Sequence, residues 1–254
     1  MKQALTLAAR RLLPLSVRRG IIRYTRWPPV GLVRMGQLRR PTPISPYWGS
    51  ERGQPVDRYY IERFLATHAA DIQGRVLEIG DNTYTRLFGG DGVVQSDVLH
   101  VADDSPQVTI IGDLTHAEHL SENAFDCFIV TQTLQFIYDV PTTIRTMHQA
   151  LKPGGVALVT VPGISKISRH DMDRWGHYWS FTSLSARRLF EATFPASHIQ
   201  VETHGNVLAA IAFLHGLASQ ELRPRELDHS DPDYQVLITI RAIKPEETAC
   251  ASPD

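Results

Sequence analysis

Acidic and imidazole side chains gather in one polar stretch, residues 162–182, directly after an apolar run. Its titratable members include His170, Asp171 and His177. A histidine close to an aspartate can accept a proton from an attacking hydroxyl, and histidine titrates near neutral pH. His177 and His170 are therefore candidate general bases, and Asp171 is a candidate catalytic partner.

Four aromatic residues lie in the same stretch: Trp175, Tyr178, Trp179 and Phe181. The faces of Trp and Tyr rings pack well against sugar rings or other flat substrates. The four rings could equally form a small core that pins the loop, and both roles can hold together. Because this loop follows a strand, it should lie over a cleft at the carboxyl end of that strand.

A second chemical feature is the end of the apolar run at residues 75–80, which reads Glu78-Ile79-Gly80. Glycine has no Cβ, so Gly80 lets the chain turn while the backbone comes close to a ligand. A strand that runs into such a turn is suited to holding a small cofactor.

Short apolar runs rich in Val and Ile must position these groups. They are residues 75–80, 93–97, 108–112, 125–131 and 156–161, with two further strands at 198–203 and 234–242. Near-continuous apolar strands of this kind belong in a parallel sheet covered on both faces. Helical spacing predicts helices at 55–70, 140–151, 183–194 and 206–219, the last two opened by Ser183 and Asn206. The predicted fold is α/β, a doubly wound, mostly parallel seven-stranded sheet.

The run Val76-Leu77-Glu78-Ile79-Gly80 resembles the first motif of the class I S-adenosylmethionine-dependent methyltransferases, roughly Val-Leu-Glu-x-Gly-x-Gly-x-Gly. The resemblance extends over residues 55–243. It implies a Rossmann-like methyltransferase fold, S-adenosylmethionine as the cofactor, and cofactor contacts from Glu78, Gly80, Asp81 and Asn82. Asn82 replaces the second glycine and tolerates a left-handed backbone. Tyr84 replaces the third glycine and could shield the cofactor, fill its pocket or point elsewhere.

Two acidic residues match later landmarks of the family. Asp97, expected at the end of the second strand, corresponds to the residue that binds the ribose hydroxyls, and a carboxylate can accept two hydrogen bonds from a diol. Asp113, after the third strand, corresponds to the residue that contacts adenine. Both could instead be solvated residues at strand ends.

Two further landmarks follow in the family's order. The fourth strand runs into Thr131 and Gln132, which match the fourth motif and imply cofactor contacts. Gln135 and Phe136 stand there where many members have Glu and His. The run Lys152-Pro153-Gly154-Gly155 closes a helix and turns the chain into the next strand, as in the family.

The resemblance implies a methyltransferase, and residues 173–182 are similar to a segment of bacterial members from sugar and cell-envelope pathways. We therefore expect O-methylation of a sugar, glycolipid or similar small metabolite. The alternative is a catalytically degenerate methyltransferase-fold protein that serves as a binding or scaffold partner, which Asn82, Tyr84 and Gln135 favour. A nicotinamide-dependent enzyme is disfavoured, because Gly80 is the single firm glycine of the turn.

Charge is distributed unevenly along the chain. The first 52 residues contain 11 of the 26 Lys and Arg residues and one of the 27 acidic residues, so a basic arm precedes an acidic body. We expect an arm at 1–54, a methyltransferase domain at 55–243 and a polar tail at 244–254. Residues 1–46 could contact an anionic membrane, dock on the acidic body or act as a targeting peptide.

Several classes of partner are not expected. No apolar run approaches the ~20 residues that span a bilayer. Cys127 and Cys250 lie far apart, which predicts no metal site and no disulfide framework. Nucleic acid is disfavoured by the acidic body and by the lack of an Asn/Asp-Pro-Pro-Tyr-like sequence after the fourth strand. These features predict a cytoplasmic protein that could also be membrane-peripheral.

Overall fold

The computed structural model describes residues 14, 17, 28, 32–102 and 105–246. The chain divides into two compact units, Met1–Thr42 and Pro43–Asp254. The membrane contact expected for residues 1–46 falls mostly outside the described residues. Within the described ranges, no helix combines the length and the apolar character that a membrane span requires.

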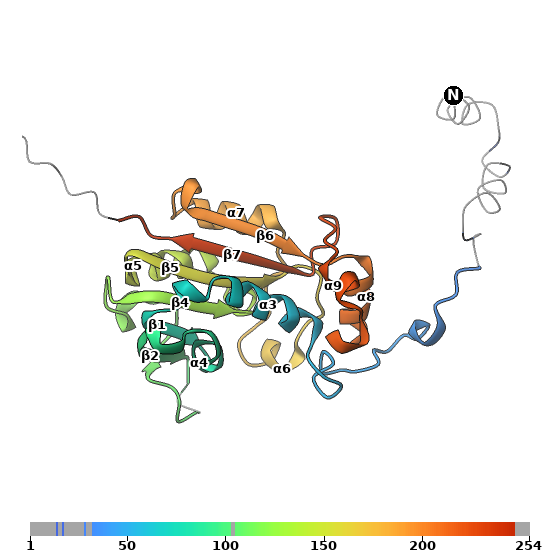
Figure 1. Ribbon diagram of the computed structural model, residues 1–254, viewed down its shortest axis with the longest axis horizontal. Helices are drawn as coiled ribbons and strands as arrows, with labels where there is room; N and C mark the ends of the chain where they lie inside the picture. The colour runs from blue at the N-terminus through green and yellow to red at the C-terminus, as the bar shows by residue number, and fades with distance from the viewer. Residues whose placement is uncertain (1–13, 15–16, 18–27, 29–31, 103–104, 247–254) are drawn as a thin grey trace, which may run out of the picture. The chain divides into compact units, whose positions relative to one another are not determined.

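In the described part of the chain, seven strands form one sheet in the order β3-β2-β1-β4-β5-β7-β6 (Figure 1). They are β1 Gly74–Ile79, β2 Val93–His100, β3 Ile110–Ile111, β4 Phe125–Thr131, β5 Leu151–Pro162, β6 Ile199–His204 and β7 Leu237–Ile243. Strands β1 to β5 pair in parallel, whereas β7 runs antiparallel to both β5 and β6. The predicted doubly wound, mostly parallel sheet is confirmed.

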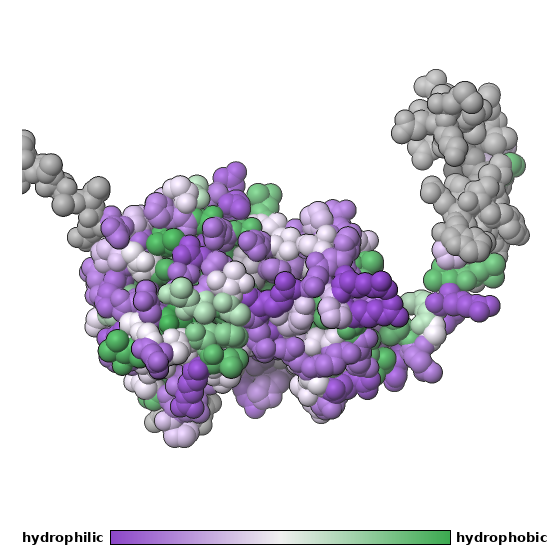
Figure 2. Space-filling view, in the orientation of Figure 1, coloured by the Kyte–Doolittle hydropathy of each residue, from purple (hydrophilic) through white to green (hydrophobic). Residues whose placement is uncertain are grey.

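Helices cover both faces of this sheet. They are α3 Val56–Thr67, α4 Thr83–Phe88, α5 Val140–Ala150, α6 Arg169–Met172, α7 Ser183–Glu191, α8 Val207–His215 and α9 Pro224–Asp228. In β4, Phe128 belongs to the core shared with α5 and α7, while Cys127 and Ile129 belong to the core shared with α3 and α8. A strand buried on both faces needs apolar residues at every position, which explains the unbroken apolar runs. Figure 2 shows hydrophilic residues over most of the visible surface.

Side-chain caps set the ends of two helices. Asn206 caps α8 as predicted, since its Oδ1 accepts the N–H groups of Leu208 and Ala209. Helix α7 begins at Ser183, as predicted. Thr182 is the capping residue, because it keeps an extended backbone at φ −117° and exchanges hydrogen bonds with Ser185.

Two boundaries differ from the sequence-based expectations. Strand β5 begins at Leu151, directly after α5, so Lys152 to Gly155 form its irregular first part instead of a separate turn. The second unit begins at Pro43, whereas we expected its start at residue 55. The N–H groups of Ile44 and Ser45 both donate to the carbonyl of His215, at 2.8 and 3.0 Å, and fasten this segment to α8.

Candidate functional site

A cavity of about 880 Å³ lies at the carboxyl ends of β1, β2 and β4, beside the point where the strand order reverses. Gly80, Asp113, Thr131 and Gln132, four of the predicted cofactor-binding residues, line it together. Its apolar wall includes Ile79, Leu99, Leu114, Phe136 and Ile137. An apolar cavity with a few convergent polar groups is typical of a site for a cofactor.

Gly80 leaves room for a ligand at this cavity. Its φ is +86°, a conformation that favours glycine, and a Cβ built on it would meet no atom within 4 Å. Its N–H donates to the carbonyl of Leu99 at 3.0 Å, which fixes the turn against β2. The backbone is thus open to close approach from the cavity, as the motif predicts.

Glu78 supports the turn from beneath instead of lining the cavity. Its carboxylate accepts the N–H groups of Tyr84 and Thr85 at 3.1 and 2.8 Å, and the Thr85 hydroxyl at 2.8 Å. Burial raises the pKa of Glu78, and the hydrogen bonds from Thr85 and Tyr84 partly oppose that rise. Glu78 therefore fixes the start of α4 behind the Gly80 turn.

The next residues of the loop also face away from the cavity. The exposed carboxylate of Asp81 accepts the N–H of Thr83 at 2.8 Å, and the Asn82 amide donates to Ser96 at 3.3 Å. Asn82 has φ −116°, so the left-handed backbone that would favour asparagine there does not occur. Tyr84 packs beside Phe88 and its hydroxyl accepts a hydrogen bond from Arg58 at 3.1 Å, so its ring does not fill the cofactor cavity.

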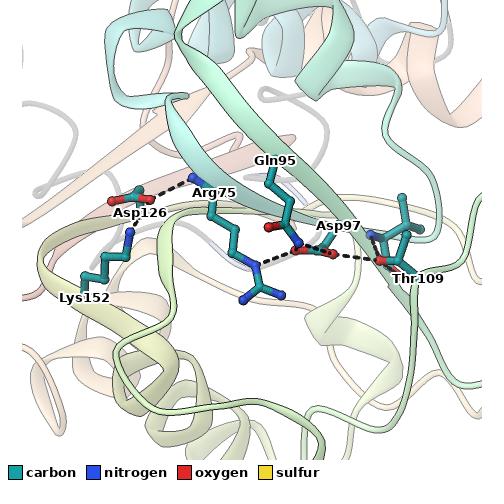
Figure 3. Close-up of polar contacts among 7 residues, drawn as sticks. Arg75, Gln95, Asp97, Thr109, Asp126 and Lys152 are labelled. Carbon is teal, nitrogen blue, oxygen red and sulfur yellow. Dashed lines mark hydrogen bonds and ion pairs between the residues drawn. The ribbon is translucent and has the colours of Figure 1, made fainter.

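The expectation that Asp97 ends the second strand is wrong. Strand β2 continues to His100, because Leu99 still pairs with both β1 and β3. Asp97 lies opposite Leu77 inside the sheet and is only 5% exposed. Its carboxylate accepts Nε of Arg75 at 2.7 Å, the amide of Gln95 at 3.0 Å and the hydroxyl of Thr109 at 3.1 Å (Figure 3).

His100 stands where Asp97 was expected, at the end of β2 and on the wall of the 880 Å³ cavity. Its Nδ1 lies 3.1 Å from the carbonyl of Ala102, and its ring meets that of Trp175 edge to face at 5.9 Å. The apolar Val98 and Leu99 after Asp97 were the sequence signal that the strand runs on.

A second cavity of about 320 Å³ adjoins the first. Gln132, Phe136 and Asp171 line both cavities and so form their shared wall. The smaller cavity is completed by the start of α3 and by Tyr47, Trp48 and Ser50. Sequence analysis assigned these last three residues to the basic arm and missed them as site residues.

Two residues of the smaller cavity have an uncommon backbone. Among the described non-glycine residues, only Trp48, Asn123 and Gln132 have φ between +48° and +58°, and Trp48 and Gln132 both line this cavity. Such conformations cost free energy and are found most often where a binding site requires them. Two of these three residues therefore lie on the smaller cavity, and one of them, Gln132, lies on the shared wall.

The three candidate catalytic residues occupy different places. Asp171 lies on the shared wall, where Oδ2 accepts the hydroxyl of Ser168 at 2.5 Å. His177 lines only the smaller cavity. His170 lines neither cavity, and 71% of its side chain is exposed. The structure therefore brings Asp171 and His177 to the site and leaves His170 in solvent.

One ring nitrogen of His177 is engaged by a hydrogen bond. Its Nδ1 accepts the N–H of Ser168 at 3.4 Å, and burial lowers the pKa of His177, with Asp171 opposing that shift. Because Nδ1 accepts this bond, Nε2 is the ring nitrogen of His177 that is left to interact with a ligand.

The methyltransferase domain family matches residues 56–204, more than half of the 254-residue chain. The chain belongs to this family. Membership confirms the predicted resemblance to class I S-adenosylmethionine-dependent methyltransferases and S-adenosylmethionine as their cofactor.

Individual relatives share little sequence identity with this chain. The ubiquinone/menaquinone biosynthesis C-methyltransferase UbiE of Haemophilus ducreyi is 29% identical over 103 residues, which cover 34% of this chain and 40% of that protein. A putative sarcosine dimethylglycine methyltransferase from Galdieria sulphuraria shares the fold at a TM-score of 0.50 and 15% identity, over 76% of this chain and 91% of that one. A SAM dependent methyltransferase from Archaeoglobus fulgidus has a TM-score of 0.49 at 10% identity, over 74% and 94%.

The larger cavity fits the family's cofactor. Its volume is within the range of ligand sites, roughly 300–1,000 Å³. The open face of Gly80 admits a ligand against the backbone, while Asp113 and His100 offer polar atoms at the ends of β3 and β2. Among the described residues, no cluster of His, Cys, Asp or Glu is arranged to hold a metal ion.

The aromatic residues of the long loop lie partly in the protein core and partly on the larger cavity. Phe181 is buried in the main core. Trp179 pins the loop by donating its ring N–H to the carbonyl of Ile137 at 3.0 Å. Trp175 and Tyr178 line the larger cavity.

A pair of variants tests the reassignment of the β2 residues. Asp97→Asn removes a carboxylate that holds Arg75, and we expect it to destabilise the protein by about 1–2 kcal/mol. Its affinity for S-adenosylmethionine should stay within about twofold, because Asp97 lies outside the cavity. His100→Ala should weaken that affinity about 5-fold or more. Thermal melts and calorimetric titration measure the two effects, and a reversed pattern of affinities would restore Asp97 as the ribose ligand.

Proposed function

We propose that this chain transfers a methyl group from S-adenosylmethionine to a hydroxyl oxygen of a small acceptor bound in the smaller cavity. The observation that carries the proposal is the wall shared by the two cavities at Gln132, Phe136 and Asp171. Direct transfer requires the acceptor and the cofactor to meet at one place, and adjoining cavities provide it. The acceptor expected from the sequence, a sugar, glycolipid or similar small metabolite, stays part of this proposal.

We assign the uptake of the hydroxyl proton to Asp171. Bound S-adenosylmethionine supplies an activated methyl group, whose carbon–sulfur bond breaks as the carbon–oxygen bond forms. Asp171 takes the hydroxyl proton from its position on the shared wall. His177 donates from Nε2 to an acceptor oxygen and so orients the substrate.

The scaffold alternative loses most of its support. It rested on Asn82, Tyr84 and Gln135, and the first two point away from the cofactor cavity. Gln135 is among the residues that line the smaller cavity.

The test is acceptor-dependent formation of S-adenosylhomocysteine by the full chain, measured by mass spectrometry with hydroxyl, amine, thiol and carbon acceptors. We expect turnover with hydroxyl acceptors and a product methylated on oxygen. Calorimetric binding of S-adenosylmethionine without turnover of any acceptor class would instead favour the scaffold role. Turnover of another class alone would keep the transfer and refute the hydroxyl.

A further inference from the structure

Arg58, the third residue of α3, lines the smaller cavity and has a guanidinium group with unused donors. One terminal nitrogen, Nη1, donates to the hydroxyl of Tyr84 at 3.1 Å. Among the described residues, its other side-chain N–H groups have no acceptor, and no carboxylate forms an ion pair with it. These nitrogens do not belong to the buried unpaired atoms of the described chain, so solvent reaches them. Arg58 therefore keeps accessible donors for a ligand.

Tyr84 is a fixed anchor for this guanidinium. Its backbone N–H donates to Glu78 at 3.1 Å, and its ring stacks on that of Phe88 with 6.2 Å between the ring centres. Burial raises the pKa of the Tyr84 phenol, and the charge and hydrogen bond of Arg58 oppose that rise. The phenol is therefore neutral at neutral pH. A neutral anchor orients the guanidinium and leaves its positive charge uncancelled.

The nearby carboxylates do not occupy the remaining donors of Arg58. Asp57 and Asp81 act on Arg58 through their charge, but neither accepts a hydrogen bond from its side chain. Instead, Oδ1 of Asp57 accepts the backbone N–H of Arg58 at 2.8 Å. Oδ1 of Asp81 accepts the backbone N–H of Thr83 at 2.8 Å. The remaining N–H groups of Arg58 can therefore donate to an oxygen atom of a molecule in the smaller cavity, as charge-assisted hydrogen bonds.

We infer that Arg58 binds the methyl acceptor by donating hydrogen bonds to one of its oxygen atoms, and that Tyr84 positions the guanidinium for this contact. The inference rests on the proposed function and adds a binding residue and a positioning residue to it. It also gives a role to the tyrosine that replaces the third glycine of the family motif. Fixing the guanidinium before the acceptor arrives reduces the side-chain freedom that is lost on binding.

The first test is Tyr84→Phe, which removes the hydroxyl and keeps the ring. The probe is whichever of mannose, rhamnose, glycerol and catechol is methylated fastest at saturating S-adenosylmethionine. We expect the KM for that probe to rise about fivefold or more. The Kd for S-adenosylmethionine should stay within about twofold, because Tyr84 does not line the larger cavity. An unchanged KM overturns the role of Tyr84 and leaves methyl transfer standing, whereas methylation of none of the probes removes the hydroxyl transfer on which the inference rests.

Helix α3 also offers a matched control. The hydroxyl of Tyr59 accepts Nη1 of Arg63 at 3.1 Å, which is the same contact at the same distance, but neither residue lines either cavity. Tyr59→Phe should therefore leave both the KM and the Kd unchanged. If Tyr59→Phe raises the KM as much as Tyr84→Phe does, the effect comes from a general loss of stability and the inference is wrong.

A double-mutant cycle determines whether Tyr84 acts through Arg58. Arg58→Met removes the guanidinium, and we expect the KM for the probe to rise about 20-fold or more. Adding Tyr84→Phe to Arg58→Met should raise the KM no further, because no guanidinium is left to position. Effects on the KM that multiply would overturn the positioning role. The same cycle in melting temperatures measures the contact without any acceptor, and strictly additive losses there would mean that the two side chains do not interact and would also overturn it.

Discussion

Gly80→Val should abolish binding of S-adenosylmethionine while leaving the protein folded. The valine side chain would enter the open space beside Gly80, which belongs to the cofactor cavity. It would also force a branched residue to φ +86°, a conformation that costs roughly 1–3 kcal/mol. We expect the affinity to fall about 100-fold or more, which corresponds to roughly 3 kcal/mol. Calorimetric titration against the wild-type protein measures it.

Gly90→Val is the matched control for backbone strain. Gly90 has φ +54°, and a Cβ on it would also meet no atom within 4 Å, but it lies outside both cavities. This variant should lose comparable thermal stability and bind S-adenosylmethionine as the wild type does. If both variants bind alike, the turn at Gly80 does not hold the cofactor.

Asp171→Asn should lower kcat about 100-fold or more with a hydroxyl acceptor. The amide keeps an oxygen that can accept the Ser168 hydroxyl but cannot take up a proton, and general base catalysis contributes about 10²–10⁴-fold. Binding of S-adenosylmethionine should change little, because the substitution preserves the shape of the shared wall. Steady-state kinetics with the cofactor titrated separately distinguish the two quantities.

His170→Ala provides the comparison on the same helix. Its imidazole lies beside Asp171, with Nδ1 3.5 Å from Oδ1, yet lines neither cavity. We expect its kcat within about twofold of the wild type. A large loss in His170→Ala together with near-normal turnover in Asp171→Asn would exchange the two assignments.

The sheet could be predicted because its signals are local. The strands β4 and β5 contain long apolar runs, and burial on both faces produces such runs. The Gly80 turn was equally readable, since a positive φ restricts the residue type. The position of Asp97 was predicted wrongly because sequence signals are local. A charged residue resembles a strand end, and its burial is explained by partners that include Arg75 on the neighbouring strand.

The smaller cavity could not be predicted, because its walls come from distant parts of the chain. Asp57, Gln135 and His177 carry no common sequence pattern, and their meeting depends on how α3 and two loops pack at one end of the sheet. The sequence therefore pointed to residues of the larger cavity, whereas the smaller cavity required three-dimensional coordinates.

The family match and the second compact unit begin at different residues, and the segment from Pro43 to Gln54 belongs only to the compact unit. The family match begins at residue 56, and the sheet with its helices is complete without the segment. Yet Tyr47, Trp48 and Ser50 close the smaller cavity, and the hydrogen bonds to His215 hold them there. We expect a chain that begins at residue 56 to keep every strand and helix of the sheet but to open the smaller cavity to solvent. The segment that closes this cavity therefore lies outside the part of the chain that the family shares.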